Sequence, residues 1–317
     1  MDREPPKDLA VIPSQLPIVS VPATKPIELS NDSINALAGA TAGLVAGVAV
    51  CPLDVAKTKL QIQGSFKLAE DRSRYRGIVG TIRTIVTEDG FRGLYRGLTP
   101  MVVGYLPTWA IYFFVYGKIQ KPGKDYAVTH TMLSAVVAGA SSTLCTNPIW
   151  VIKTRLMAQG QHTAWQYKGI FDAARQIFQK EGPLAFYSGL GSALLGLPHV
   201  AIQFPTYEYL KRKLYSPSAP DWFQIVTYLG SSVLSKIIAS SITYPHEVVR
   251  SRQQISGALG DQRYSTILKT VVALYRNEGW RGFYAGLGTN ICRAVPASAV
   301  TLMTYETVSH FLRKRYL

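Results

Sequence analysis

Apolar stretches alternate with shorter polar ones along the 317-residue chain, in an order that recurs three times. Each copy opens with a long apolar stretch rich in small residues, which runs into Pro52, Pro148 or Pro245. A basic stretch follows, and a second long apolar stretch closes the copy. The prolines are 96 and 97 residues apart. This spacing indicates a duplicated multi-helix module and not a solenoid unit, whose period is about 20–50 residues.

The first apolar stretch of each copy predicts a membrane helix that packs closely on its neighbours. In the first copy it covers about residues 33–63, with Gly39, Gly43 and Gly47 at intervals of four residues. Small residues at this spacing let two helix backbones approach closely in a bilayer. In a soluble helix the same glycines would only cost stability. The proline near the end of the stretch should kink the helix.

The rest of each copy predicts two further helices. The basic stretches over about residues 75–88, 167–180 and 264–277 have the length of short amphipathic helices. The second apolar stretches, over about residues 98–121, 190–213 and 287–313, are long enough to cross a hydrocarbon core of about 30 Å. The pattern therefore predicts an all-α membrane protein with six transmembrane helices. Its expected repeats are 33–125, 126–218 and 219–317.

Composition agrees with helices that have one lipid face and one polar face, because the hydrophobic fraction of 47% is that of a soluble protein. The net charge of +15 predicts an anionic partner: anionic lipid, a phosphate-bearing solute or nucleic acid. The basic residues recur at repeat-related positions and form no single stripe with interleaved aromatics, which argues against nucleic acid. The three cysteines and five histidines show no metal-ligand spacing, so we expect no metal and no cofactor.

Residues 1–32 contain six prolines and no long apolar run, so we predict a disordered tail. The tail holds more acidic than basic side chains, unlike an organellar presequence. An even number of crossings places both termini on one side of the membrane, opposite the basic loops. Because basic loops tend to face the interior compartment, the termini should face outward.

Two motifs recur in register with the repeat. After each proline, a basic residue follows five positions on, and the first and third copies also have an acid two positions on. An acid-glycine pair and a Tyr-x-Gly element come later in each copy, as in Asp89-Gly90 and Tyr95-Arg96-Gly97, with a closely similar set in the second and third copies. On these motifs the chain, over about residues 33–315, is identified as a member of the mitochondrial carrier family. The resemblance implies a pseudo-threefold barrel of six tilted helices in the mitochondrial inner membrane, with both termini toward the intermembrane space and three short helices on the matrix side.

The resemblance also implies a gate at the matrix end of a central cavity, where side chains of neighbouring repeats pair. Trp150 stands where the second copy would carry its acid, so the ring has two ion pairs and an indole beside Arg250. A cation–π contact there would be worth about 0.5–2 kcal/mol. Gln61 is at the position where family members brace a pair with an amide. The implied pairs are Asp54 with Lys153 and Glu247 with Lys57.

A second gate at the opposite end is expected to be weak. The aromatic-acidic-x-x-basic motif of the family is complete only in the second copy, and the other copies lack the acid, the base or both. The residues in question are Tyr116, Tyr207, Glu208, Lys211, Tyr305 and Glu306. Cardiolipin is the implied lipid partner, at the helix starts marked by Arg76, Gly77, Lys168 and Gly169, because helix N-termini favour anions. A simple helix cap is the alternative at these starts.

The substrate is argued from positions expected to face the cavity. Arg293 matches a family position that contacts substrate phosphates, and Lys236 is a second intramembrane cation whose alternative is to reach the membrane interface. Trp109 could stack on a base or a nicotinamide ring, or face lipid. His199 either contacts the substrate or is a polar residue packed against its neighbours. The other candidates are Tyr105, Thr108, Tyr112, Gly196, Leu197 and Gln203, of which Gly196 and Leu197 suggest a slot for an adenine ring.

Cations, aromatic rings and small-residue slots together suggest an anionic nucleotide or dinucleotide. The Pro148-Ile149-Trp150 motif is similar to the branch of the family that carries pyrimidine nucleotides, folate or FAD, and NAD. Within that branch the chain looks most like the NAD carriers of fungi and plants. The resemblance thus implies a monomeric carrier that imports NAD+ in exchange for AMP or ADP. FAD, folate or a pyrimidine nucleotide are the alternatives, and a nucleotide-handling membrane enzyme is a more distant one, since no nucleophile–base pair or metal cluster is visible.

Overall fold

A computed structural model describes residues 31–66, 74–120, 128–161, 163, 165–197, 199–214 and 220–316, which form helices and turns without a strand. This confirms the expected all-helical class for the described part of the chain. The predicted tail, 1–32, lies almost wholly outside it. The long helices are α1 (Asn31–Ile62), α4 (Leu98–Ile119), α5 (Val128–Ala158), α9 (Asp221–Leu259) and α11 (Leu287–Tyr316). The shorter ones are α3 (Gly77–Gly93), α6 (Ile170–Glu181), α7 (Leu190–Leu194), α8 (His199–Leu214) and α10 (Ile267–Glu278).

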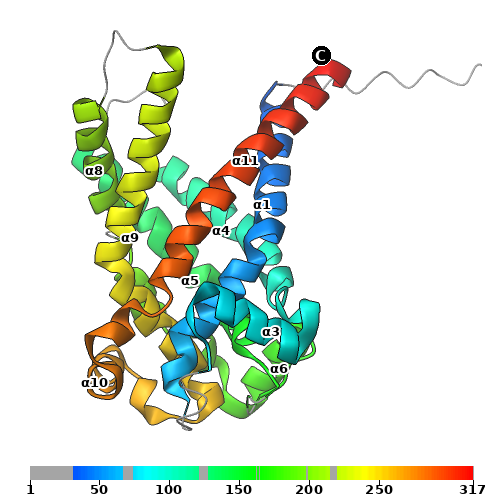
Figure 1. Cartoon of the computed structure of the whole chain (residues 1–317), viewed down its shortest axis with the longest axis vertical. Coiled ribbons are helices and arrows are strands. Elements are labelled where there is room, and N and C mark those ends of the chain that lie inside the picture. The colour runs from blue at the N-terminus through cyan, green and yellow to red at the C-terminus, as the bar shows by residue number, and fades with distance from the viewer. Residues whose placement is uncertain are drawn as a thin grey trace, which may run out of the picture.

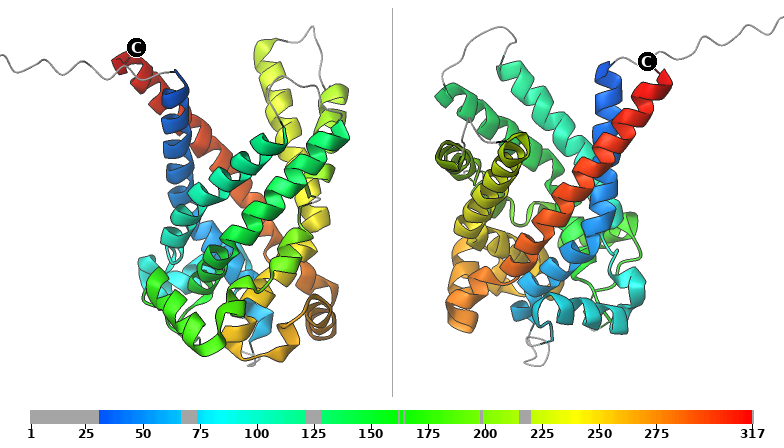
Figure 2. Two further views of the ribbon diagram at one scale, coloured as in Figure 1. Left: turned by 180° about the vertical axis from the view of Figure 1, so that it is seen from behind. Right: turned by 45° about the horizontal axis from the view of Figure 1, so that its top comes forward.

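The long helices pack in pairs that join neighbouring repeats. α1 packs along α11, α4 along α5, and α8 along α9. Figures 1 and 2 show that these pairs diverge toward the end of the molecule where α1 begins and α11 ends. The short helices α3, α6 and α10 lie at the opposite end (Figure 1). Both ends of the described chain are therefore on one side of the molecule.

Within the described residues, three helices are long and apolar enough to cross a membrane by length and composition, over 34–65, 98–119 and 130–158. α9 and α11 have the length, with 39 and 30 residues, but a more polar composition. The single helix predicted over 190–213 is wrong, because α7 ends at Leu194 and α8 begins only at His199. The sequence Gly196-Leu197-Pro198 explains the break, since glycine destabilises a helix and proline disfavours a helical residue before it.

The glycines of α1 do not mediate the close helix packing that their spacing predicts. A Cβ built on Gly39 or Gly43 would have nothing within 4 Å, and one on Gly47 would approach only the end of the Met101 side chain, at 3.2 Å. Met101 belongs to α4, so Gly47 is the one glycine of the three that lies against the second helix of its own repeat. The close approach is thus absent from this conformation.

The tight packing lies instead at the end with the short helices. A glycine with positive φ directly precedes α4, α7 and α11, one in each repeat. Its Cβ would press on the carbonyl oxygen of a basic residue in a neighbouring repeat, at 3.1 or 3.2 Å. Only glycine fits this left-handed backbone and this close contact. The recurrent Tyr-x-Gly element is therefore a docking point between repeats. Its glycines are Gly97, Gly189 and Gly286.

A buried basic residue seven positions after each proline binds the acid of the second motif. Arg155 donates two hydrogen bonds to Glu181, one of them 2.7 Å long, and Arg252 donates two to Glu278, at 2.7 and 2.9 Å. Both guanidinium groups are fully buried. Each also donates from Nε to a backbone carbonyl of another repeat, at 2.8 and 2.6 Å. These pairs therefore hold each repeat together and tie the repeats to one another.

The first repeat builds the same contact from different residues. Lys59 replaces arginine and Asp89 replaces glutamate, with 3.5 Å between the ammonium nitrogen and the carboxylate. A single ammonium cannot form the two-pronged contact of a guanidinium. Arg96 supplies a second cation at 2.9 Å from Asp89, and both Lys59 and Arg96 donate to the carbonyl of Gln159. The other repeats carry no charged side chain at the position of Arg96.

Gly257→Ala should destabilise the protein, because the new Cβ would take the place of the Glu181 carboxylate and push it away from Arg155. Breaking a buried ion pair costs about 3–5 kcal/mol. Thermal unfolding of the purified protein in detergent measures the effect. Gly43→Ala is the matched control, because its Cβ meets open space and alanine favours the helix by about 1 kcal/mol. Equal melting temperatures for the two variants would contradict this account.

Candidate functional site

A cavity of about 1370 Å³ extends from Asn35, near the start of α1, down to Glu247 and Arg293. Residues of α1 and α4 from the first repeat and of α9 and α11 from the third provide most of its lining, and Gly196 and His199 add a contribution from the second repeat. Six of the predicted substrate-binding residues line it: Tyr105, Trp109, Gly196, His199, Lys236 and Arg293.

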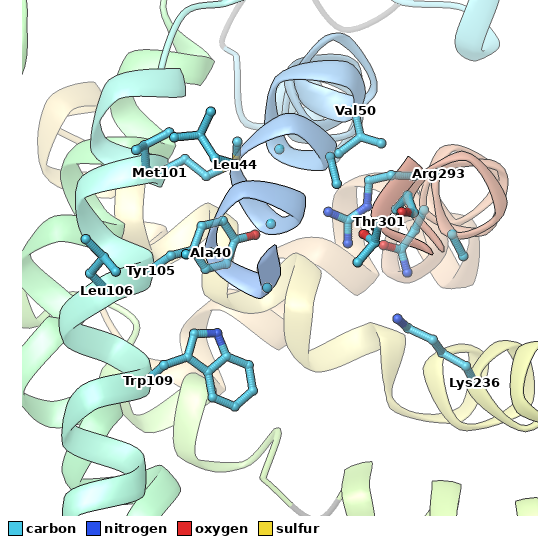
Figure 3. Close-up of a pocket in the computed structure, with 18 of the residues that line it drawn as sticks. Ala40, Leu44, Val50, Met101, Tyr105, Leu106, Trp109, Lys236, Arg293 and Thr301 are labelled. Carbon is cyan, nitrogen blue, oxygen red and sulfur yellow. Dashed lines mark hydrogen bonds between the residues drawn. The ribbon is translucent and has the colours of Figure 1, made fainter. Parts of the chain in front are cut away.

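Positive charge and aromatic rings lie on facing walls of this cavity. Figure 3 shows Lys236 and Arg293 projecting from one side and Tyr105 and Trp109 from the other. Trp109 is 53% exposed, so its ring is available to a bound molecule. Phe113 also lines the cavity and stacks on Trp109, with 5.6 Å between ring centroids. Phe113 is not among the residues predicted from the sequence, although it follows Trp109 by one helical turn.

The remaining predicted substrate residues are placed away from the cavity lining. The Thr108 hydroxyl donates to the carbonyl of Gly104, and the Thr108 carbonyl accepts from Ser142 of α5. Tyr112 packs against its aromatic neighbours on α4. Leu197 lies against Gly139, and Gln203 is half-buried.

The expected adenine slot beside Gly196 is filled by another side chain. The imidazole of His246 occupies the space that a Cβ on Gly196 would need. His246 itself lines the cavity and bonds through Nδ1 with the carbonyl of Thr243. His199 bonds through Nδ1 with the Thr243 hydroxyl at 3.0 Å. The imidazoles of His199 and His246 thus both bond to Thr243 of α9. Of the two, only His199 is among the site residues predicted from the sequence.

At the base of the cavity, the expected pair between Lys57 and Glu247 is present, at 2.5 Å. Lys57 also donates to the side-chain oxygen of Asn290 at 2.8 Å, and Asn290 donates to the hydroxyl of Ser240 at 2.8 Å. Asn290 was not predicted. Its position one turn before Arg293, on a helix expected to be membrane-spanning, was the available signal.

The second expected pair differs from its prediction. The Asp54 carboxylate is 4.0 Å from the Lys153 ammonium, whereas Arg293 donates to it at 2.6 Å. Asp54 is buried, and its Oδ2 has no hydrogen-bond partner among the described residues. Asp54, the gate acid of the first repeat, is therefore bound to Arg293, the residue predicted to bind the substrate phosphate.

The cation–π contact expected between Trp150 and Arg250 is wrong. The indole instead lies under the ammonium of Lys153, 5.0 Å away, and meets Tyr105 edge-on. Lys153 is one turn further along the same helix, which explains why it reaches the ring first. In the described part of the chain Nε of Arg250 is buried and has no hydrogen-bond partner.

Gln61 does not bond to the ion pair that it was expected to brace. Its amide nitrogen donates to the hydroxyl of Tyr244 at 3.0 Å, and its oxygen accepts from Ser251 at 2.7 Å. Both partners are on α9. Gln61 thus links the first helix of one repeat to that of another, just below the Lys57–Glu247 pair.

The predicted outer-gate residues stay apart at the diverging ends of the helices. Tyr116 stacks on Tyr112, Lys211 lies over Tyr207 at 5.9 Å, and the Tyr305 hydroxyl donates to Asn35 at 3.2 Å. Glu208 and Glu306 form no ion pair within the described residues. The predicted outer gate is therefore open in the present conformation.

The predicted lipid positions lie at helix starts on the opposite end. Arg76 precedes α3, whose first residue Gly77 has positive φ, and Gly169 precedes α6. Arg76 and Lys168 are exposed. The amide of Lys168 already donates to Asp172 at 2.8 Å, and this hydrogen bond holds the pKa of that carboxyl below its usual value.

Trp150→Asp should give Arg250 the acid that the second repeat lacks and so strengthen the gate. Trp150→Asn is the matched control, because it also removes the indole but adds no charge. We expect the aspartate variant to be more stable than the asparagine variant by about 1.5–3 kcal/mol, the value of a charged hydrogen bond, and to transport more slowly. The difference should vanish when Arg250→Gln is added to both. Thermal unfolding and uptake rates measure it, and equal behaviour of the two single variants would refute a latent third pair.

Comparison with known proteins identifies the fold family. The model of the family "Mitochondrial carrier protein" matches residues 31–123, 124–218 and 221–316. The chain is 47% identical to mitochondrial nicotinamide adenine dinucleotide transporter 1 of Saccharomyces cerevisiae, over 88% of this chain and 77% of the relative. It is 42% identical to the chloroplastic nicotinamide adenine dinucleotide transporter 1 of Arabidopsis thaliana, over 90% of this chain and 94% of the relative. It is 38% identical to the chloroplastic folate transporter 1 of the same plant, over 88% of this chain and 96% of the relative. With the family model matching all three repeats, the chain belongs to the mitochondrial carrier family.

Proposed function

We propose that this protein carries NAD+ across the mitochondrial inner membrane by alternating access, in exchange for an adenine nucleotide such as AMP or ADP. The observation that carries the proposal is one cavity with two cations on one wall and exposed aromatic rings on the other (Figure 3). A dinucleotide has the matching chemistry, a negative pyrophosphate joined to flat rings. Two relatives with printed names of NAD transporters support the same substrate.

In this proposal the pyrophosphate binds Arg293 and Lys236. A cation within a membrane helix is costly unless it faces water or an anionic partner. Both side chains line the cavity, and the guanidinium of Arg293 offers five N–H donors in the planar arrangement that suits phosphate oxygens. Nε of Arg293 is buried and has no hydrogen-bond partner among the described residues. That donor is available to a phosphate.

The flat rings of the substrate bind the facing wall. Tyr105, Trp109 and Phe113 follow one another at four-residue intervals, so they form a row along one face of α4. Stacking of a base on an aromatic side chain contributes about 1–3 kcal/mol. The positively charged nicotinamide ring is further suited to this wall, since the face of an aromatic ring attracts cations. The same ring would be repelled by Arg293 and Lys236.

The proposed architecture is a barrel of six tilted transmembrane helices, from three repeats over 33–125, 126–218 and 219–317. Both termini face the intermembrane space, and α3, α6 and α10 face the matrix. The proposed carrier is a monomer. Cardiolipin is its proposed lipid partner, and the start of α3 is the better site, because Asp172 places a negative charge at the start of α6.

Folate, FAD or a pyrimidine nucleotide is the second candidate cargo. The identity of 38% to a chloroplastic folate transporter supports it. These solutes share flat rings and negative charge with NAD+, so the same two walls could bind them. A nucleotide-handling membrane enzyme is less well supported, because the relatives with printed activities are transporters.

Arg293→Ala should abolish uptake of every anionic substrate without unfolding the protein, because the side chain lines a cavity and Lys153, 4.0 Å from Asp54, can pair with the carboxylate that loses Arg293. The measurement is uptake of radiolabelled NAD+, FAD, folate, UTP, AMP and ADP by proteoliposomes loaded with each counter-substrate. NAD+ uptake in exchange for AMP or ADP supports the proposal. Uptake of another solute without uptake of NAD+ would refute NAD+ as the cargo. Full activity of the Arg293→Ala variant would refute Arg293 as the phosphate-binding residue.

Trp109→Ala should weaken NAD+ binding by about 1–3 kcal/mol, roughly a fivefold to hundredfold rise in Kd, through loss of ring stacking. Phe114→Ala is the matched control, because Phe114 is on the same helix and 67% exposed but does not line the cavity. Isothermal titration calorimetry with NAD+ compares them. If both variants bind as tightly as the natural chain, the aromatic wall has no part in recognition.

A further inference from the structure

One contact between repeats occurs three times in the structure, but only one copy is charged. The position seven residues after the glycine of each Tyr-x-Gly element faces the proline motif of another repeat. In the first copy Gly104 approaches Ile149 and Trp150, and in the second Gly196 approaches His246. In the third copy Arg293 binds Asp54. The threefold fold therefore brings these positions together by itself, and the ion pair is an addition specific to the third copy.

The geometry of this ion pair leaves Asp54 shared between two cations. Its Oδ1 accepts from Nη1 of Arg293 at 2.6 Å, while its Oδ2 faces Lys153 at 4.0 Å and has no hydrogen-bond partner among the described residues. Lys153 and Arg293 come from α5 and α11, and Asp54 from α1. A small movement of one carboxylate thus changes which helix is bonded to α1.

We propose that Asp54 occupies Arg293 in the empty carrier in place of a substrate phosphate, and transfers to Lys153 when a phosphate binds Arg293. This inference rests on the proposed function, in which Arg293 binds the phosphate. Two negative groups on one guanidinium repel each other, so a bound phosphate weakens the hold of Arg293 on Asp54. Lys153 is the nearest described cation that can then receive the carboxylate.

The exchange of partners has a consequence for transport. In the empty carrier the Asp54–Arg293 pair links α1 to α11 across the base of the cavity. Substrate binding releases that link, and only a substrate with a negative group can do so. Asp54 thus joins α1 to α11 in the empty carrier and α1 to α5 in the loaded carrier, so binding of an anionic substrate changes which helices are bonded at the base of the cavity.

The test compares NAD+ affinity in two pairs of variants of the full chain, by isothermal titration calorimetry in detergent at fixed ionic strength. Asp54→Asn frees Arg293 and should lower Kd about tenfold, the value of one charged hydrogen bond. Glu247→Gln makes the same charge change at the equivalent motif position but removes a partner of Lys57, so Kd should fall by about threefold or less. The Kd values for AMP should rank these variants in the same order as the Kd values for NAD+.

The second pair tests the receiving cation and remains informative if Asp54→Asn does not fold. Lys153→Gln leaves the displaced Asp54 without a partner and should raise Kd about fivefold. Lys57→Gln removes the same charge from the same motif position and should raise Kd less. Equal shifts within either pair would overturn the partner exchange while leaving the proposed function intact. Failure of the natural chain to bind any nucleotide would instead overturn the proposed function, and this inference with it.

Discussion

The base of the cavity holds more positive than negative side chains, and this imbalance determines how the gate is built. Lys57, Lys153, Arg250 and Arg293 meet there, with Asp54 and Glu247 as the acids of the gate motifs. Because Trp150 replaces the third acid, each carboxylate must serve more than one cation or leave one without a partner. Burying such charge without a counter-ion is costly. In the proposed function, an anionic cargo supplies the negative charge that the chain itself lacks.

The structure combines a fixed base with a divergent opposite end. At the base, paired charges and close glycine contacts tie each repeat to its neighbours, and they leave little freedom to move. At the other end the helix pairs separate (Figure 2), Tyr116 stacks on Tyr112 of its own helix, and a Cβ on Gly39 or Gly43 of α1 would have nothing within 4 Å. A cavity that is open at one end and bonded at the other is the arrangement that alternating access requires of one of its two states.

Much of this could be predicted from the sequence, because it follows from repetition. The prolines, the acid-glycine pairs and the Tyr-x-Gly elements recur in register, and a duplicated motif must occupy equivalent places in a symmetric fold. The break before α8 was also present in the sequence as Gly196-Leu197-Pro198 but was outweighed by the apolar stretch around it. The basic residues bound to Glu181 and Glu278 recur seven positions after each proline and could have been found the same way.

What could not be predicted is the choice of partner where several lie within reach. Asp54 was assigned to Lys153 by its place in the motif, but the packing of α11 against α1 brings Arg293 closer. Asn290 and His246 are polar, whereas the equivalent positions of the other repeats carry Met101 and Ala193, and Leu53 and Ile149. Such contacts depend on distances of an ångström or two. Those distances come from the packing of the whole bundle and leave no periodic signal in the chain.

The most direct test is an experimental structure of the carrier with NAD+ bound in this same cavity-open state. Our account predicts density for the pyrophosphate within hydrogen-bond distance of Arg293, a ring of the dinucleotide against Trp109, and the Asp54 carboxylate bonded to Lys153. A structure with the phosphates elsewhere and the Asp54–Arg293 pair intact would contradict it.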